Sequence, residues 1–265
     1  MNRWLDLADH RLEYVWHGPP PREAPALVFL HDGLGSVSSW SDFPLLLAES
    51  SGCGALVYSR RGHGGSDRAI LPRAVRFLHD EALAMLPRIL ETLGVAEPIL
   101  VGEGDGASIA LIAAAEGRIR ARGLLLEAPR VFVEPGGLRT IESASRAFER
   151  GDLRRALARH HESDVDATFR GWAGVWLDPE FQAWNIEEAL PRVSVPVLAI
   201  QGEDDPYGTL RQVETIAAKC AGFVKVLVLR NCGHSPHREK PDRTREEMAR
   251  FLRDEILSGN PGART

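Results

Sequence analysis

The sequence of 265 residues contains no apolar run close to the roughly 18 residues that a helix needs to cross a lipid bilayer. Its first residues are mixed and charged, without the apolar centre of a secretory signal peptide. Cysteine is also scarce: Cys53, Cys220 and Cys232 are odd in number, and their spacing fits no metal site. We therefore expect reduced thiols, no bound metal, no membrane partner and a cytoplasmic location.

Positive charge is in the minority. Lysine and arginine number 32 against 37 aspartates and glutamates, a net charge of −5, and they form no basic block. A nucleic-acid partner therefore lacks electrostatic support. The chain also lacks the G-x-G-x-x-G pattern of dinucleotide-binding enzymes, so we expect no cofactor. We expect a small-molecule partner, and the sequence leaves a homodimer open.

Short apolar runs alternate with helical stretches along most of the chain. Because these runs are continuous rather than alternating, they predict strands buried on both faces, as in a parallel sheet; they are residues 26–30, 54–58, 99–101, 123–126, 195–200 and 224–229. Helical spacing of apolar residues predicts helices at 79–93, 107–115, 210–221 and 243–257. With an antiparallel hairpin at residues 4–16, the pattern indicates a doubly wound, mostly parallel α/β sheet of about eight strands.

One long segment interrupts this alternation. Residues 130–192 contain no convincing strand, and their helical pieces are expected at 140–150 and 153–161. We interpret the segment as a helical lid inserted into a core formed by residues 1–129 and 193–265, whose last residues should fray.

A glycine-rich turn follows the third predicted strand. The stretch Gly102-Glu103-Gly104-Asp105-Gly106 precedes an apolar helix, which is the context of a G-x-S-x-G nucleophile elbow. Gly104 stands at the position where such an elbow carries its nucleophilic side chain. A plain glycine-rich turn that binds phosphate is the alternative, although no Lys-Ser/Thr pair follows.

Two more polar clusters follow later strands. The turn ending in Asp204 and Asp205 comes after residues 195–200, and a loop with His234 comes after residues 224–229. Alone, each is an ordinary turn or loop. Ligands bind beyond the carboxyl ends of strands in open α/β sheets, and the order elbow, acid, histidine is that of the α/β-hydrolase triad.

The chain resembles α/β-hydrolases over nearly its whole length. The motifs that carry the resemblance are the elbow, His31-Asp32-Gly33-Leu34-Gly35 with Trp40, Arg61-Gly62-His63-Gly64-Gly65-Ser66, the turn from Gly202 to Asp205, and Gly233-His234-Ser235-Pro236 with Glu239 and Pro241. The resemblance implies His234 as the base and Asp205 as the acid, with Asp204 as the alternative. It implies structural roles for the histidines His31, His63 and His237.

The resemblance also implies an oxyanion hole. Its two donors would be the backbone N–H groups of Asp105 and Gly33. The family usually has His-Gly where this chain has His31-Asp32. An open hole therefore requires the Asp32 side chain to point away from it.

Glycine cannot attack a carbonyl group, so three hypotheses follow. The chain could be a serine hydrolase whose nucleophile is replaced by Gly104, and we favour this because the rest of the machinery is retained. It could be a natural enzyme in which the His234–Asp205 pair activates water or a substrate proton, or a silent ligand-binding protein. Epoxide hydrolases and dehalogenases are disfavoured because both need a carboxylate at the elbow. The flanking glycines predict that a serine at position 104 would fit.

Aromatic side chains in the predicted lid indicate the kind of substrate. Trp172, Trp176 and Trp184, together with Phe169 and Phe181, predict an apolar or aromatic acyl group, although a lid core explains each of them singly. Arg130, Arg170 and His160 are candidates to meet a substrate carboxylate. Esters, thioesters, amides and carbon–carbon bonds next to ketones all remain open.

Overall fold

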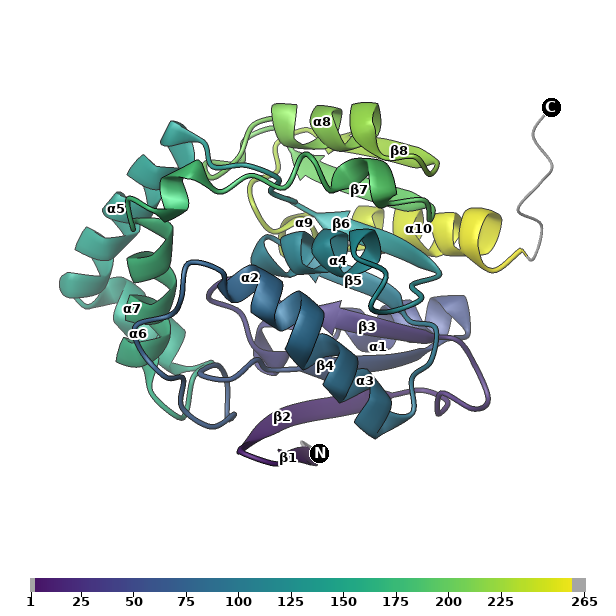
Figure 1. The fold of residues 1–265 in the computed structure, drawn as a ribbon, viewed down its shortest axis with the longest axis horizontal. Helices are drawn as coiled ribbons and strands as arrows, with labels where there is room; N and C mark the ends of the chain where they lie inside the picture. The colour runs from purple at the N-terminus through teal and green to yellow at the C-terminus, as the bar shows by residue number, and fades with distance from the viewer. Residues whose placement is uncertain (1–2, 259–265) are drawn as a thin grey trace.

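The computed structural model describes residues 3–258, which form one eight-stranded sheet with helices on both faces (Figure 1). The strand order is β1-β2-β4-β3-β5-β6-β7-β8, with antiparallel pairing at β1–β2 and β2–β4 and parallel pairing elsewhere. The strands are β1 Arg3–Leu7, β2 His10–His17, β3 Ala26–Leu30, β4 Gly54–Tyr58, β5 Ile99–Glu103, β6 Gly123–Glu127, β7 Val197–Gly202 and β8 Val224–Leu229. The predicted doubly wound α/β fold is confirmed.

The central strands follow the predicted apolar runs closely. β3, β4 and β8 match them, whereas β5, β6 and β7 continue past the last aliphatic residue. These strands continue because the hydrogen bonds between strands use only backbone groups and do not require apolar side chains. Glu103, for example, pairs with Glu127 at the ends of β5 and β6. Both glutamates are buried. The predicted tail from residue 259 onward lies outside the described residues.

The helices cover the two faces of the sheet because alternate strand residues point to opposite sides. Leu27 and Phe29 join one core cluster with α1 and α10, and Val28 and Leu30 join the other with α3 and α4. The helices of the core are α1 Phe43–Ser51, α2 Phe77–Asp80, α3 Leu86–Leu93, α4 Asp105–Ala115, α8 Arg211–Lys219, α9 Pro236–Glu239 and α10 Pro241–Phe251. A π-helical turn joins α2 to α3, so the predicted helix at 79–93 is one continuous helical stretch.

The chain between β6 and β7 is helical, as expected. It forms α5 Pro135–Glu149, α6 Asp152–Ala158 and α7 Val165–Trp176, which gather at one end of the sheet (Figure 1). Helix α7 was not among the predicted helical pieces, and its first turn is capped by the Asp164 side chain, which accepts from the Ala167 N–H at 3.0 Å. That this segment works as a lid stays a prediction. Within residues 3–258, no helix combines the length and apolar character needed to span a membrane.

Candidate active site

The turn between β5 and α4 has a backbone shape that glycine adopts easily. Gly104 has φ 51° and ψ −112°, a region that residues with a Cβ atom rarely occupy. Its N–H donates to the carbonyl oxygen of Glu127 at 3.0 Å, which fixes the turn to the next strand. A Cβ atom at Gly104 would lie 3.2 Å from Nε2 of His234. The turn therefore aims position 104 at the predicted catalytic histidine.

The predicted acid and histidine are in contact. Nδ1 of His234 donates to the carboxylate of Asp205, at 2.9 Å from Oδ2 and 3.0 Å from Oδ1. Asp205 also accepts from the side chain of Gln201 at 2.7 Å and from the N–H of Tyr207 at 2.8 Å. Asp204 is exposed and makes no such contact. These bonds fix the orientation of the imidazole, leaving Nε2 toward position 104.

Asp32 does not point away from the predicted oxyanion hole, contrary to the requirement of the sequence analysis. Its Oδ1 accepts the backbone N–H of Asp105 at 3.1 Å. A Cβ atom at Gly104 would overlap Oδ1 of Asp32 and lie 2.7 Å from its Cγ. The Asp32 carboxylate thus fills the space of an elbow side chain. The expectation that a serine fits at position 104 is wrong for this arrangement.

A buried arginine fixes the loop that carries Asp32. Arg60 is 1% exposed, and its guanidinium donates to the carbonyl oxygens of His31 at 2.5 Å and Asp32 at 3.0 Å. The Arg60 N–H donates to Nε2 of His31 at 2.9 Å. Arg60 was not among the predicted site residues, although it directly precedes the motif that begins at Arg61. Because Arg60 fixes the backbone carbonyls of His31 and Asp32, the Cα–Cβ bond of Asp32 has a fixed direction toward the site.

Charges on either side of His234 set the protonation of the site. Burial disfavours the imidazolium, but the hydrogen bond to Asp205 and the negative charges of Asp205 and Asp32, whose Oδ2 lies 3.7 Å from Nε2, raise the pKa of His234 to about 10. Burial likewise opposes ionisation of Asp32, yet His234, Arg130 and the N–H of Gly33 hold the pKa of Asp32 well below its ordinary value. At neutral pH, the site contains an imidazolium between two carboxylates.

A second buried cation faces Asp32. The guanidinium of Arg130, 3% exposed, has Nη2 at 3.8 Å from Oδ1 of Asp32. It stacks on Trp176 with its carbon 4.4 Å from the ring centroid and on Tyr207 at 5.6 Å. Burial and the charge of Asp32 raise the pKa of neighbouring Asp105 to about 6. Arg130 is the one of the three cationic candidates that the structure brings to this site.

Two of the three predicted lid tryptophans reach the site. The indole of Trp172 lies against Gly33, so that a Cβ atom there would overlap it. Nε1 of Trp176 donates to Oδ1 of Asp105 at 3.1 Å. Trp184 is farther out and stacks on Phe181 with ring centroids 5.5 Å apart. Trp172 and Trp176 cover the charged residues, and the role of all three tryptophans in binding substrate stays a prediction.

Comparison with known proteins identifies the family. The sequence pattern of the alpha/beta hydrolase family matches residues 27–247. The chain belongs to the alpha/beta hydrolase family. It is 27% identical to the 2-succinyl-6-hydroxy-2,4-cyclohexadiene-1-carboxylate synthase of Salmonella paratyphi C strain RKS4594 over 264 aligned positions, covering 91% of this chain and 98% of the synthase.

Solved structures agree on the fold. A hydrolase from Pseudomonas aeruginosa PA01 superposes with a TM-score of 0.74 at 21% identity, covering 95% of this chain and 98% of that one. The enol-lactonase of Burkholderia xenovorans LB400 superposes with a TM-score of 0.74 at 19% identity, covering 95% and 100%. At these identities the likeness establishes the fold alone.

In this alpha/beta hydrolase, the three histidines to which the resemblance assigned structural roles each make a hydrogen bond outside the catalytic pair. Nδ1 of His31 donates to the carbonyl of Asp32 at 2.7 Å, Nε2 of His63 to that of Gly33 at 3.0 Å, and Nδ1 of His237 to Glu127 at 3.0 Å. Burial and Arg60 hold the pKa of His31 well below its ordinary value. These contacts fit the structural roles that the resemblance implied.

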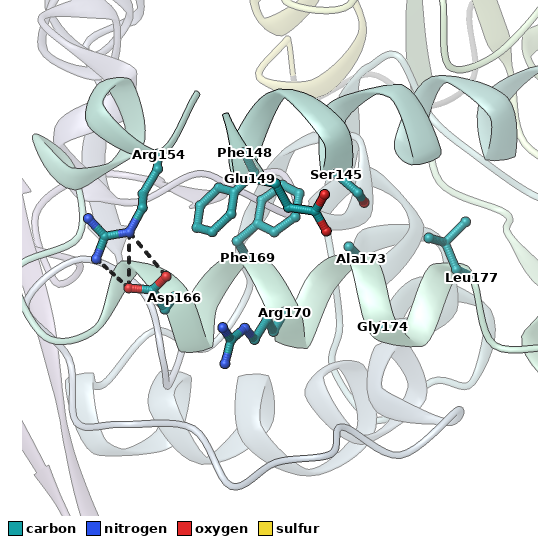
Figure 2. Close-up of a pocket in the computed structure, with 10 residues that line it drawn as sticks. All are labelled: Ser145, Phe148, Glu149, Arg154, Asp166, Phe169, Arg170, Ala173, Gly174 and Leu177. Carbon is teal, nitrogen blue, oxygen red and sulfur yellow. Dashed lines mark hydrogen bonds and ion pairs between the residues drawn. The ribbon is translucent and has the colours of Figure 1, made fainter. Parts of the chain in front are cut away.

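Three other residues predicted to meet substrate, Phe169, Arg170 and His160, lie elsewhere in the alpha/beta hydrolase. Phe169 and Arg170 line a hollow of about 480 Å³ among α5, α6 and α7, beside the ion pair of Arg154 and Asp166 (Figure 2). None of the predicted catalytic residues borders it. His160 bonds to Ser38 at 2.9 Å. Among residues 3–258, no cluster of three or more His, Cys, Asp or Glu residues could hold a metal ion.

Proposed function

We propose that this alpha/beta hydrolase is a hydrolytic enzyme in which the His234–Asp205 pair acts on substrate and water without an elbow nucleophile. The observation that carries the proposal is the Asp32 carboxylate, which fills the space that an elbow side chain would need. Gly104 and Asp32 are sterically complementary, as expected of a natural site rather than of a site with one residue removed. The aromatic cover of Trp172 and Trp176 favours a substrate with an apolar or aromatic group.

The protonation of His234 sets the order of events. With its pKa raised to about 10 by Asp205 and Asp32 against the effect of burial, His234 is an imidazolium at rest. As water attacks the reacting carbon of the substrate, the bond to the leaving group breaks and the leaving group takes the Nε2 proton of His234. The neutral imidazole then takes the proton that the added water releases, and Asp205 stabilises the imidazolium that forms again. Both steps use the nitrogen that faces position 104.

The nucleophile-replaced serine hydrolase is the second candidate, acting on an ester, thioester or related acyl substrate. The backbone of Gly104 and the 3.2 Å from its Cβ position to Nε2 of His234 favour it, since a serine hydroxyl there would meet its base. This candidate requires the Asp32 carboxylate to leave its place.

The test compares the chain as it stands with Gly104→Ser and His234→Ala. The substrates are chromogenic esters and thioesters together with aromatic epoxides, and the exposed Asp204→Asn serves as the control. Our proposal expects turnover by the chain and its Asp204→Asn control, loss with His234→Ala, and no gain with Gly104→Ser. A gain on the order of 10³ or more in ester hydrolysis by Gly104→Ser would support the second candidate instead. Absence of turnover by all forms would indicate a binding protein.

A further inference from the structure

The Asp32 carboxylate has the contacts of a reacting group. Its Oδ1 is held by the N–H of Asp105 at 3.1 Å, and its Oδ2 lies 3.7 Å from Nε2 of His234. We propose that Asp32 is the covalent nucleophile that the elbow lacks, and that the substrate is an epoxide carrying an apolar or aromatic group. The inference rests on the proposed function, because His234 must still activate the water that completes the reaction.

The charge state of Asp32 favours a nucleophile over a base. Burial opposes its ionisation, but His234, Arg130 and the Gly33 N–H keep its pKa well below the ordinary value, so it is an anion at neutral pH. A carboxylate with a lowered pKa accepts a proton poorly, whereas its lone pairs remain able to attack carbon. Against the effect of burial, the hydrogen bond from His234 lowers the pKa of Asp205 too, but the Asp205 carboxylate is already bonded to Nδ1 and is not placed to attack.

The same carboxylate restricts the kind of carbon that it can attack. Attack on an ester carbonyl would give a tetrahedral adduct that returns to the starting ester, because the adduct expels the carboxylate more easily than an alkoxide. Attack on the saturated carbon of an epoxide forms a stable ester instead. An Asp32 lone pair makes the new O–C bond, the ring C–O bond breaks, and the ring oxygen takes that electron pair and the Nε2 proton of His234. The imidazolium thus supplies the acid that opening of an epoxide needs.

The hydroxyalkyl ester is then positioned for hydrolysis. Neutral His234 takes a proton from water, and the hydroxide attacks the Asp32 ester carbonyl. The developing charge falls on the oxygen to which the N–H of Asp105, one of the two predicted oxyanion donors, already donates. When the ester C–O bond breaks, the departing alkoxide takes the proton of the new carboxylic acid. The net reaction adds one water to the epoxide and gives a vicinal diol, with Asp32 and His234 back in their starting forms.

Unpartnered donors line the same place. Nε of Arg130 and Nε1 of Trp172 are buried and have no hydrogen-bond partner within residues 3–258. A buried donor without a partner costs about 1–3 kcal/mol, so a bound oxygen that accepts from it is favoured. Trp172 lies against Gly33, and Arg130 faces Asp32. These donors are placed to hold the oxygens of the opened epoxide.

The experiment follows oxygen from water during a single turnover. The full chain, in excess over styrene oxide, reacts in ¹⁸O-labelled water, and mass spectrometry reads the diol and the peptide containing Asp32. We expect an unlabelled diol and one heavy oxygen in the Asp32 carboxylate, because the diol receives its new oxygen from Asp32. The His234→Gln variant should accumulate the hydroxyalkyl ester on Asp32. Asp32→Asn should lose diol formation on the order of 10³ or more, whereas Asp204→Asn should keep it.

The outcomes separate the two proposals. A labelled diol with unlabelled Asp32 would mean that water attacks the epoxide directly, which overturns the inference and leaves the proposed function standing. Hydrolysis of esters without any opening of styrene oxide would also overturn the inference and leave the proposed function standing. Absence of turnover on every substrate overturns both. The labelling measurement uses the unaltered chain, so it decides the matter even if a variant fails to fold.

Discussion

Replacing Gly104 by serine should destabilise the fold, because two separate costs coincide at this position. The backbone at φ 51° and ψ −112° is strained for a residue with a Cβ, by about 1–3 kcal/mol. The Cβ would also overlap Oδ1 of Asp32 and displace it from the N–H of Asp105. Loss of that bond to a charged group costs about 1.5–3 kcal/mol. The sum is about 2.5–6 kcal/mol, a large part of the about 5–15 kcal/mol that stabilises a typical protein.

The two costs can be separated by a double-mutant cycle. The free energy of unfolding is measured by urea denaturation for Gly104→Ser in the original chain and in an Asp32→Gly background. Without the carboxylate, only the backbone cost of about 1–3 kcal/mol should remain. Gly174→Ser is the matched control, since a Cβ at this α7 position meets nothing within 4 Å. Equal costs in the two backgrounds, or no cost in the original chain, would refute the steric argument.

Three further outcomes test the surroundings of the histidine. Trp176→Phe removes the bond from Nε1 to Asp105 and should lower the unfolding free energy by about 1–3 kcal/mol, whereas Trp184→Phe should cost less because its N–H has no partner within residues 3–258. The pKa of His234 is raised from 6.5 to about 10 in the folded protein, so the stability that its charge contributes is complete below pH 6.5 and disappears as the pH rises through 10. The free energy of unfolding, measured across this pH range, should therefore fall less in His234→Gln than in the unaltered chain. Asp205→Asn should reduce turnover on the order of 10²–10⁴, measured on whichever substrate the unaltered chain hydrolyses.

Local patterns were sufficient to predict the sheet. Apolar runs such as Ala26–Leu30 become strands with both neighbours present, because their residues are buried on both faces. The approach of Asp205 to His234 was also predictable, since both follow parallel strands that end at one edge. Helix α7 was missed although Val165, Phe169, Trp172 and Trp176 recur at helical spacing, because its aromatic residues were interpreted as substrate contacts rather than as the buried face of a helix.

The direction of the Asp32 side chain could not be predicted from local sequence. It depends on Arg60, which holds two loop carbonyls from a different strand end, and on the space that Gly104 leaves open. Both are long-range contacts that no periodicity encodes. The departure from His-Gly in this loop was a signal that residue 32 is unusual, but it did not reveal that the carboxylate enters the site. A carboxylate nucleophile was disfavoured from the sequence because only position 104 was considered as its place.

The position of Asp32 explains three features together. It accounts for the small residue at Gly104, for the imidazolium at His234 and for the burial of Arg130, whose charge would otherwise be costly inside the protein. Asp32 lies between the two cations His234 and Arg130, and its negative charge offsets part of the positive charge of both. Removing the Asp32 carboxylate disturbs this balance as well as any bond that it forms with substrate. An Asp32 variant should therefore lose activity whether Asp32 only holds the site together or attacks the substrate. Only the appearance of a water oxygen in the Asp32 carboxylate during a single turnover distinguishes a nucleophile from a structural residue.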